Sequence, residues 1–210
     1  MNIVLALSAL AVLMVQPLAA QYPRLATRAS PEVQAAVVPV LDSARAQGLP
    51  VEPLEEKVLE GVTKSASPDR IAAAVRRLAT DLAAARAALG DRSSTRELEA
   101  GAGALRGGIT SRDLTRMRAA RKDEDPAVAL EVATDLVSQG VPAESAAAVV
   151  LNVVSAGASD GDLEQMRAAV ARDIAGGVPP SVAAALRGRA LSAPGSQRDA
   201  SPEPAFSPRD

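Results

Sequence analysis

The sequence predicts an all-α fold, an array or bundle of about eight to nine short helices formed by two to three degenerate helix-hairpin repeats. Apolar residues make up 48% of the 210 residues but aromatic residues only 1%, so the core must consist of Ala, Val, Leu, Ile and Met. Ala and Leu lead the scale of helix propensity, whereas a sheet core would use aromatic and β-branched residues. Apolar residues also recur with helical spacing between recognisable caps.

Each expected helix is located by its start signal and its apolar stripe. Ser30-Pro31-Glu32 and Ser67-Pro68-Asp69 each combine a serine N-cap, a proline at the first helical position and an acid in the first turn. Pro39 is expected to kink or break the first helix, because proline has no amide hydrogen. The nine expected helices cover about residues 30–47, 50–64, 68–89, 94–106, 111–122, 126–139, 142–156, 160–175 and 179–190.

The first twenty residues have the pattern of a secretory signal peptide. An apolar run over residues 3–15 has the length of a signal-peptide core and is short for a membrane span. Leu18 and Ala20 would be the −3 and −1 residues of a cleavage before Gln21, although no Lys or Arg precedes the apolar run. We therefore predict a signal peptide over 1–20, cleaved between Ala20 and Gln21, and a periplasmic or secreted protein. A buried first helix and an uncleaved membrane anchor are the alternatives.

Composition divides the remaining chain into three parts. Residues 21–29 are expected to form a short N-terminal linker, and residues 30–191 a helical repeat domain. Residues 192–210 contain four prolines and no periodic apolar pattern, so we expect a disordered C-terminal tail.

The repeat domain contains an internal duplication. When the chain is shifted by 92 positions, residues 48–83 align with residues 140–175 without a gap, and the apolar register is kept. A fainter middle copy lies 49 positions before the last, where TSRDLTRMRAA from Thr110 matches SDGDLEQMRAA from Ser159. The expected repeat units are 48–90, 91–139 and 140–191, and each needs its neighbours to bury its apolar face.

Three of the expected helices follow the same tripeptide, a Gly, a branched apolar residue and a Pro. Each glycine is predicted to end the preceding helix in the left-handed conformation, which glycine adopts easily because it has no Cβ. The branched residue then contacts the helix just ended, and the proline is expected at the first position of the next helix. These structural corner residues are Gly48 and Pro50, Gly140 and Pro142, and Gly177 and Pro179.

The stretch GLPVEPLEEKVLEGVTKSASPDRIAAAVRRL, residues 48–78, resembles uncharacterised secreted all-helical bacterial proteins with Gly-Leu/Val-Pro corner repeats. Their pattern is Gly-Leu-Pro, an acid, an apolar helix, a small-residue loop and a second helix that ends in an Ala-Val-Arg segment. Residues 140–175 repeat this pattern more loosely. The resemblance implies a secreted helical fold, and it assigns no activity and no residue role.

Composition also excludes several functions. The chain has no Cys and no His, which removes thiolate nucleophiles, disulfides, imidazole bases, Ser-His-Asp triads and the usual zinc sites. A net charge of −2 provides no general attraction to nucleic acid, and Tyr22 and Phe206 are the only aromatic residues available for base stacking. We expect no enzyme activity, no cofactor and no metal.

Two acidic patterns could be read as sites, but a helix cap is the stronger interpretation of both. Glu52 and Glu144 occupy equivalent positions and could form a catalytic pair, yet each is expected in the first turn of a helix, opposite the positive end of its dipole. SDGDLE, residues 159–164, resembles a fragment of a calcium loop. Ser159 and Asp162 instead have the spacing of a capping box.

A basic stretch and a glycine-rich stretch also have ordinary structural interpretations. AVRRLATDLAAAR, residues 74–86, could be a basic amphipathic helix on a membrane surface. A solvated face with an ion pair between Arg77 and Asp81 is the more ordinary interpretation. GAGALRGG, residues 101–108, lacks the strand and the Lys-Ser/Thr of a phosphate-binding loop, so a loose helix end is expected.

These observations favour a secreted or periplasmic helical-repeat protein, a non-enzymatic scaffold or protein-binding module with an unknown protein partner in the cell envelope. Binding would use an exposed groove between helix pairs. The alternative is an envelope-associated protein that docks on membrane or lipid through a basic amphipathic helix or the retained N-terminal segment. An enzyme that works with carboxylates alone is the weakest hypothesis.

Overall fold

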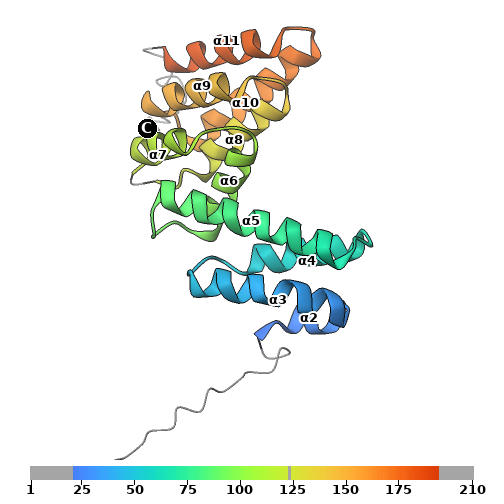
Figure 1. Cartoon of the computed structure of the whole chain (residues 1–210). Coiled ribbons are helices and arrows are strands. Elements are labelled where there is room, and N and C mark those ends of the chain that lie inside the picture. Colours follow the sequence, from blue (N-terminus) through green and yellow to red (C-terminus); the bar gives the residue numbers. More distant parts are fainter. Residues whose placement is uncertain (1–20, 123, 194–210) are drawn as a thin grey trace, which may run out of the picture.

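The computed structural model describes residues 21–122 and 124–193 and confirms the all-α class (Figure 1). The predicted signal peptide and residues 194–210 of the predicted tail lie outside the described residues. Within the described residues there are ten helices and no strand. The helices are α2 Pro23–Arg28, α3 Pro31–Ala46, α4 Glu52–Thr63, α5 Pro68–Leu89, α6 Thr95–Arg106, α7 Ser111–Ala120, α8 Ala127–Ser138, α9 Ala143–Ser155, α10 Asp160–Ala175 and α11 Pro180–Ser192.

The helices are stacked in two rows, and successive helices of the chain alternate between the two rows. In one row, α3, α5, α7, α9 and α11 each contact the next member. The other row contains α2, α4, α6, α8 and α10, but α4 and α6 are not closely packed. The stack rises in one direction from α2 to α11, as in helical-repeat proteins, in which each unit contacts only its neighbours (Figure 1).

Aliphatic side chains form one continuous core along the stack. Small residues allow the helices to approach closely, as the sequence composition requires. A Cβ atom on Gly61 would lie 2.7 Å from Cγ1 of Ile71, and one on Gly101 would lie 3.0 Å from Cβ of Ala85. Glycine is therefore needed where α4 and α6 each press on α5.

Residues 21–29 are not the linker that composition predicted. Pro23–Arg28 form helix α2, and Tyr22 and Leu25 are fully buried. The Tyr22 hydroxyl donates to Oδ1 of Asp42 at 2.7 Å, and the Arg45 guanidinium lies over the ring, 4.5 Å from its centre. The prediction was wrong because a six-residue helix is too short to show an apolar period, and contacts with α4 and a hydrogen bond from Gln34 of α3 to the Leu25 carbonyl order it.

Helix α3 continues through Pro39, where a kink or a break was expected. The proline leaves the carbonyl of Ala35, four residues earlier, without its helical donor. Both residues are exposed, so water can donate to that carbonyl in place of the missing amide. Exposure explains why the helix is not broken.

At the three tripeptide corners the glycines have left-handed backbones, with φ of +70° at Gly48, +94° at Gly140 and +91° at Gly177. At the first corner the Leu49 amide donates to the Ala44 carbonyl at 2.9 Å, and the Gly48 amide donates to the Arg45 carbonyl at 2.8 Å. The same two hydrogen bonds occur at the other two corners. They form the Schellman motif, which satisfies the last carbonyls of each helix.

The corner prolines lie one or two positions earlier than the predicted first helical position. Pro142 and Pro179 are N-caps with ψ of 138° and 136°, and their carbonyls accept the first helical hydrogen bonds. Pro50 comes one residue before the N-cap Val51. After a Schellman turn the chain needs an extended residue before it re-enters a helix, and the fixed φ of proline suits that conformation.

A second set of corners, which the sequence did not predict, leads into α5, α7 and α10. Gly108 and Gly157 have φ of +91° and +88° and again make both Schellman hydrogen bonds. In the first repeat Ser65 takes their place, with φ of +53°. The stretch 101–108 thus ends in a defined C-cap, where a loose helix end was expected, because Ile109 is buried directly after it.

Candidate functional site

The space between α4 and α6 results from the length of α5. Helix α5 has 22 residues, whereas α10, its counterpart in the duplication, has 16. At a rise of about 1.5 Å per residue the difference is about 9 Å. Helix α4 packs on the first half of α5, where Gly61 meets Ile71, and α6 packs on the second half, where Gly101 meets Ala85. The middle of α5 is therefore left uncovered on this side.

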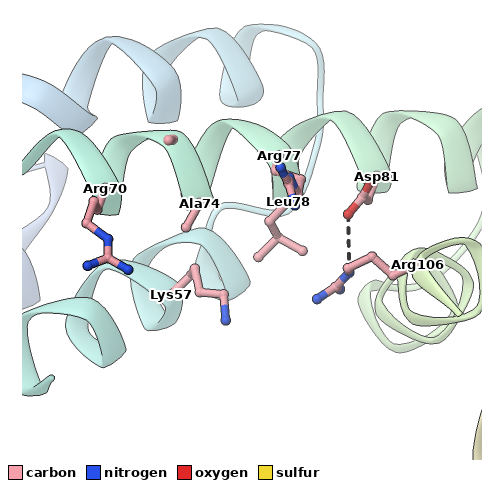
Figure 2. A pocket seen from close by; sticks show the side chains of 8 residues that line it. Lys57, Arg70, Ala74, Arg77, Leu78, Asp81 and Arg106 are labelled. Carbon is pink, nitrogen blue, oxygen red and sulfur yellow. Dashed lines mark ion pairs between the residues drawn. The ribbon is translucent and has the colours of Figure 1, made fainter. Parts of the chain in front are cut away.

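This uncovered stretch is a groove of about 440 Å³, with α5 as its floor and α4 and α6 as its walls (Figure 2). We call it the α5 groove. Lys57 extends into it from α4 and Arg106 from α6. The remaining lining residues follow one side of α5 at intervals of three or four: Arg70, Ala73, Ala74, Arg77, Leu78 and Asp81.

Cations dominate the α5 groove. Its one carboxylate, Asp81, pairs with Arg106, with 3.2 Å between Oδ2 and Nε (Figure 2). The expected pair between Arg77 and Asp81 is wrong, because a guanidinium from the neighbouring helix occupies the carboxylate. Arg70 and Arg77 are exposed, and neither has an ion pair within the described part of the chain.

The outer edge of the groove, between α4 and α6, is acidic. Glu60 accepts from Lys57 and Lys64 at 2.6 and 2.5 Å, and these two bonds lower the pKa of Glu60 to about 2. Glu56 and Glu99 line an adjoining hollow. Burial, followed by the charge of Glu56, raises the pKa of Glu99. The groove is thus basic along α5 and acidic where it opens between α4 and α6.

The cations are specific to the first repeat. Under the shift of 92 positions, Lys57, Arg70 and Arg77 correspond to Val149, Asp162 and Ala169. The second copy has an apolar residue, a capping acid and an alanine where the first has three cations. The repeat fold therefore does not require a basic residue at any of these three positions.

In the second repeat, the space equivalent to the α5 groove is closed by direct packing of two helices. Helix α11, the counterpart of α6, packs directly on α9, and a Cβ on Gly188 would lie 2.6 Å from Cγ1 of Val149. Gly188 is the ninth residue of α11, and the ninth residue of α6 is Gly103. A Cβ on Gly103 would have no neighbour within 4 Å. The groove is thus a property of the first repeat and not of the topology.

The start of α5 departs twice from the pattern of the other repeats. Helices α7 and α10 begin with capping boxes closed by Asp113 and Asp162 at the third helical position. In α5 that position is Arg70, and the N-cap Ser67 makes no side-chain hydrogen bond. A cation there faces the positive end of the helix dipole. Ser65, in its left-handed conformation, lines the same hollow as Arg70 beside the groove.

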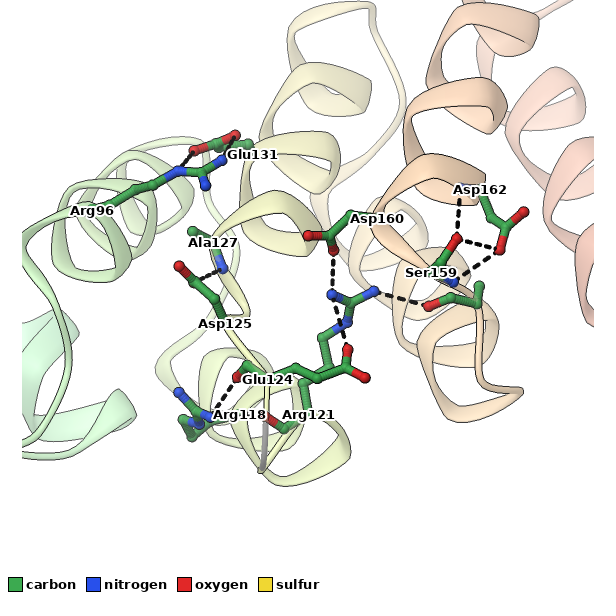
Figure 3. Close-up of polar contacts among 11 residues, drawn as sticks. Arg96, Arg118, Arg121, Glu124, Asp125, Ala127, Glu131, Ser159, Asp160 and Asp162 are labelled. Atoms are coloured by element: carbon green, nitrogen blue, oxygen red, sulfur yellow. Dashed lines mark hydrogen bonds and ion pairs between the residues drawn. The ribbon is translucent and has the colours of Figure 1, made fainter.

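A second polar cluster, around Arg121, holds the fold together (Figure 3). Arg121 is buried, and its guanidinium donates to the Asp160 carboxylate and, at 2.9 Å, to the Ala158 carbonyl. Arg118 donates to Glu97 at 2.6 Å and to the Glu124 carbonyl at 2.7 Å. These bonds tie the connection after α7 to α6 and to the start of α10, so we assign the cluster a structural role.

The acidic candidates act as caps or ion-pair partners. Glu52 and Glu144 lie in the first turns of α4 and α9, in different parts of the stack, and do not form a carboxylate pair (Figure 1). Ser159 and Asp162 form a capping box, and Asp160 pairs with Arg121. Over residues 21–122 and 124–193, no group of three or more acidic side chains converges as a metal site would require.

Sequence reasoning did not single out Arg70 or Lys57. The sequence did contain one signal for Arg70. The third helical position is an acid in α7 and α10, whereas in α5 it is Arg70. In the described helices, none is both long and apolar enough to cross a membrane. Comparison with known protein families, with curated proteins and with solved structures finds no match to this chain.

Proposed function

We propose that this chain is a secreted or periplasmic, non-enzymatic scaffold that binds a partner protein of the cell envelope through its helical repeats. The α5 groove is the observation that carries the proposal. Among the described residues, it leaves Arg70 and Arg77 without ion pairs on the uncovered side of α5, whereas the second repeat closes the equivalent space with Val149 and Gly188. Stacked helical repeats commonly bind partners along open surfaces of this kind.

The N-terminal sequence supports the export part of the proposal. Residues 1–20 have the composition of a signal peptide. Tyr22 is fully buried, so cleavage before Gln21 would keep this core residue in the mature chain.

Docking on lipid through the basic helix has less support. A helix that lies on a membrane needs a free apolar face. The apolar residues of α5, among them Ile71, Val75 and Leu82, are buried in the core. The uncovered side offers alanines, Leu78 and arginines instead, which leaves little apolar surface for lipid.

Site-specific photo-crosslinking in cells tests the proposal. A benzophenone amino acid would replace Ala74 inside the groove, and in a matched control it would replace Ala87, which is also exposed on α5 but lies outside the groove. We expect the Ala74 position to give a discrete protein adduct in the osmotic-shock or medium fraction, and the Ala87 position to give none.

Three results would contradict this proposal. Retention of the chain in the cytoplasm would exclude export, and equal adducts from both positions would exclude the groove as the binding surface. Pelleting with membranes that is reversed by high salt would favour the lipid-docking alternative.

A further inference from the structure

We infer that the α5 groove binds an acidic segment of a partner protein, with an apolar side chain placed between two carboxylates. The inference rests on the proposed partner-binding function and specifies the chemistry of the segment bound. It is carried by the arrangement of charge and apolar surface along one side of α5.

Arg70 and Arg77 are seven residues apart and lie on the same side of the helix, about 10 Å from each other along its axis. Ala73 and Ala74 lie between them and Leu78 lies beside Arg77, and the three form a shallow apolar floor. An extended chain advances about 13 Å over four residues, and its alternate side chains share one face. A carboxylate, an apolar residue and a second carboxylate at alternate positions would therefore match the groove.

Arginine suits this role better than a general positive charge would. Its planar guanidinium binds a carboxylate through two parallel hydrogen bonds, which fixes orientation as well as charge. Lys57 and Arg106 stand on the two walls and are already paired with Glu60 and Asp81. Arg70 and Arg77 are thus the cations that a bound segment would neutralise.

The surroundings of the groove disfavour a long polyanion. Glu56, Glu60 and Glu99 line its outer side between α4 and α6, and the whole chain has a net charge of −2. A nucleic acid strand or a densely anionic surface would meet these carboxylates as well as the arginines. A short segment with its carboxylates on one side avoids them.

The start of α5, beside the groove, lacks two locally stabilising residues that the other repeats have. Arg70 replaces the acid that closes the capping box in α7 and α10, and Ser65 replaces the glycine of two equivalent corners. Departures from otherwise consistent local rules are expected at functional sites. Both departures adjoin the same basic groove, which indicates a site kept for binding.

Fluorescence anisotropy with two defined peptides tests the inference. The probe is a fluorescein-labelled peptide with the core Glu-Ser-Leu-Ser-Glu, and the control peptide has Lys in place of both Glu. We expect the full chain to bind the acidic peptide, with an affinity that falls as salt rises, and not to bind the basic peptide.

The double variant Arg70→Asp/Arg77→Ala gives positions 70 and 77 of the groove the residues of the second repeat. It should weaken binding of the acidic peptide by about tenfold or more. Arg70→Asp also supplies the acid of a capping box, so the thermal midpoint should not fall, and lost binding cannot be attributed to unfolding. Arg76→Ala removes an exposed α5 cation outside the groove and should change the affinity by less than about twofold.

Equal effects of the double variant and Arg76→Ala would overturn the inference, as would binding of both peptides or of neither. Arginine-dependent binding to anionic phospholipid vesicles without peptide binding would assign the groove to a lipid headgroup. Arginine-dependent self-association in sedimentation would assign it to a second copy of this chain, and either assignment also overturns the inference. A partner crosslinked through the Ala74 position, combined with no peptide binding, would contradict this inference while leaving the proposed function intact.

Discussion

Ser65 has a φ of +53°, the single positive φ among the described non-glycine residues. The left-handed conformation brings Cβ close to the following carbonyl oxygen, at a cost of roughly 1–2 kcal/mol for an L-residue. Gly108 and Gly157 avoid this cost at the equivalent corners. The strain at Ser65 is therefore a property of the residue and not of the corner.

Ser65→Gly should raise the free energy of unfolding by about 0.5–1 kcal/mol, because relief of the strain exceeds the added entropy of the unfolded chain. The reciprocal change Gly157→Ser should lower it by a similar amount. Urea unfolding followed by circular dichroism measures both. A neutral Ser65→Gly beside a destabilising Gly157→Ser would show that contacts at the groove edge offset the strain.

At the scale of helices, α6 and α11 occupy equivalent positions in their repeats. Their ninth residues, Gly103 and Gly188, have opposite surroundings. Gly188→Ala should lower the free energy of unfolding by about 1–3 kcal/mol, because its Cβ would lie 2.6 Å from Val149. Gly103→Ala should raise it by up to about 1 kcal/mol, because nothing lies within 4 Å and alanine favours the helix. Thermal unfolding of the two single variants makes the comparison, and equal shifts would contradict the open space between α4 and α6.

The last helix is held by a paired arginine and carboxylate. Nε and Nη2 of Arg187 donate to the two carboxylate oxygens of Asp173 at 2.7 Å each, which lowers the pKa of Asp173 from its ordinary value of 3.8. A group with a lowered folded-state pKa stabilises the fold above its unfolded pKa, and loses that contribution as pH falls through the folded value.

Hydrogen exchange in α11 should therefore speed up as the pH is lowered below 3.8, after correction for the intrinsic rate. Asp173→Asn should speed up exchange at neutral pH and flatten the acid dependence. The core amides of α6 serve as an internal reference. An unchanged acid profile in Asp173→Asn would assign the acid sensitivity to other carboxylates.

Local signals located most of the helices in advance. Ser30 and Ser159 are N-caps in the structure, as their sequence surroundings predict, because capping depends on residues three or four positions away. Helix α2 escaped prediction because packing and not periodicity orders it. Asp81 forms its ion pair with Arg106 of another helix, and a local sequence pattern cannot predict a partner on a different helix.

The α5 groove could not be predicted from the sequence for the same reason, because it depends on contacts between helices. The lengths of α5 and α10 were visible in the sequence, but their consequence for the distance between α4 and α6 depends on where each helix packs along α5. The sequence did contain Arg70 at a capping position that holds an acid in the other copies. A comparison of the repeats at that position indicated Arg70, and the basic stretch 74–86 already contained Arg77.

On the scale of the whole molecule, the stack formed by residues 21–122 and 124–193 has two ends, at α2 and α11. Val182 and Leu186 of α11 are 55% and 57% exposed, because no helix of the described stack covers them. Each helix contacts only near neighbours along the chain. Stability in such arrays is approximately a sum of unit and interface terms, so the ends can open while the centre stays folded.

Two chemically identical substitutions test this view of the whole stack. Leu25 in α2 and Leu136 in α8 are both fully buried, so each change to Ala removes the same atoms. Leu136→Ala should lower the free energy of unfolding of all the central helices by about 2–5 kcal/mol, because α8 contacts α6, α9 and α10. Leu25→Ala should release only α2 and the helices beside it, since among the described helices α2 has neighbours on one side alone. Native-state hydrogen exchange resolves the two patterns helix by helix, and equal loss of protection in α9 from both variants would mean that the stack unfolds as one unit.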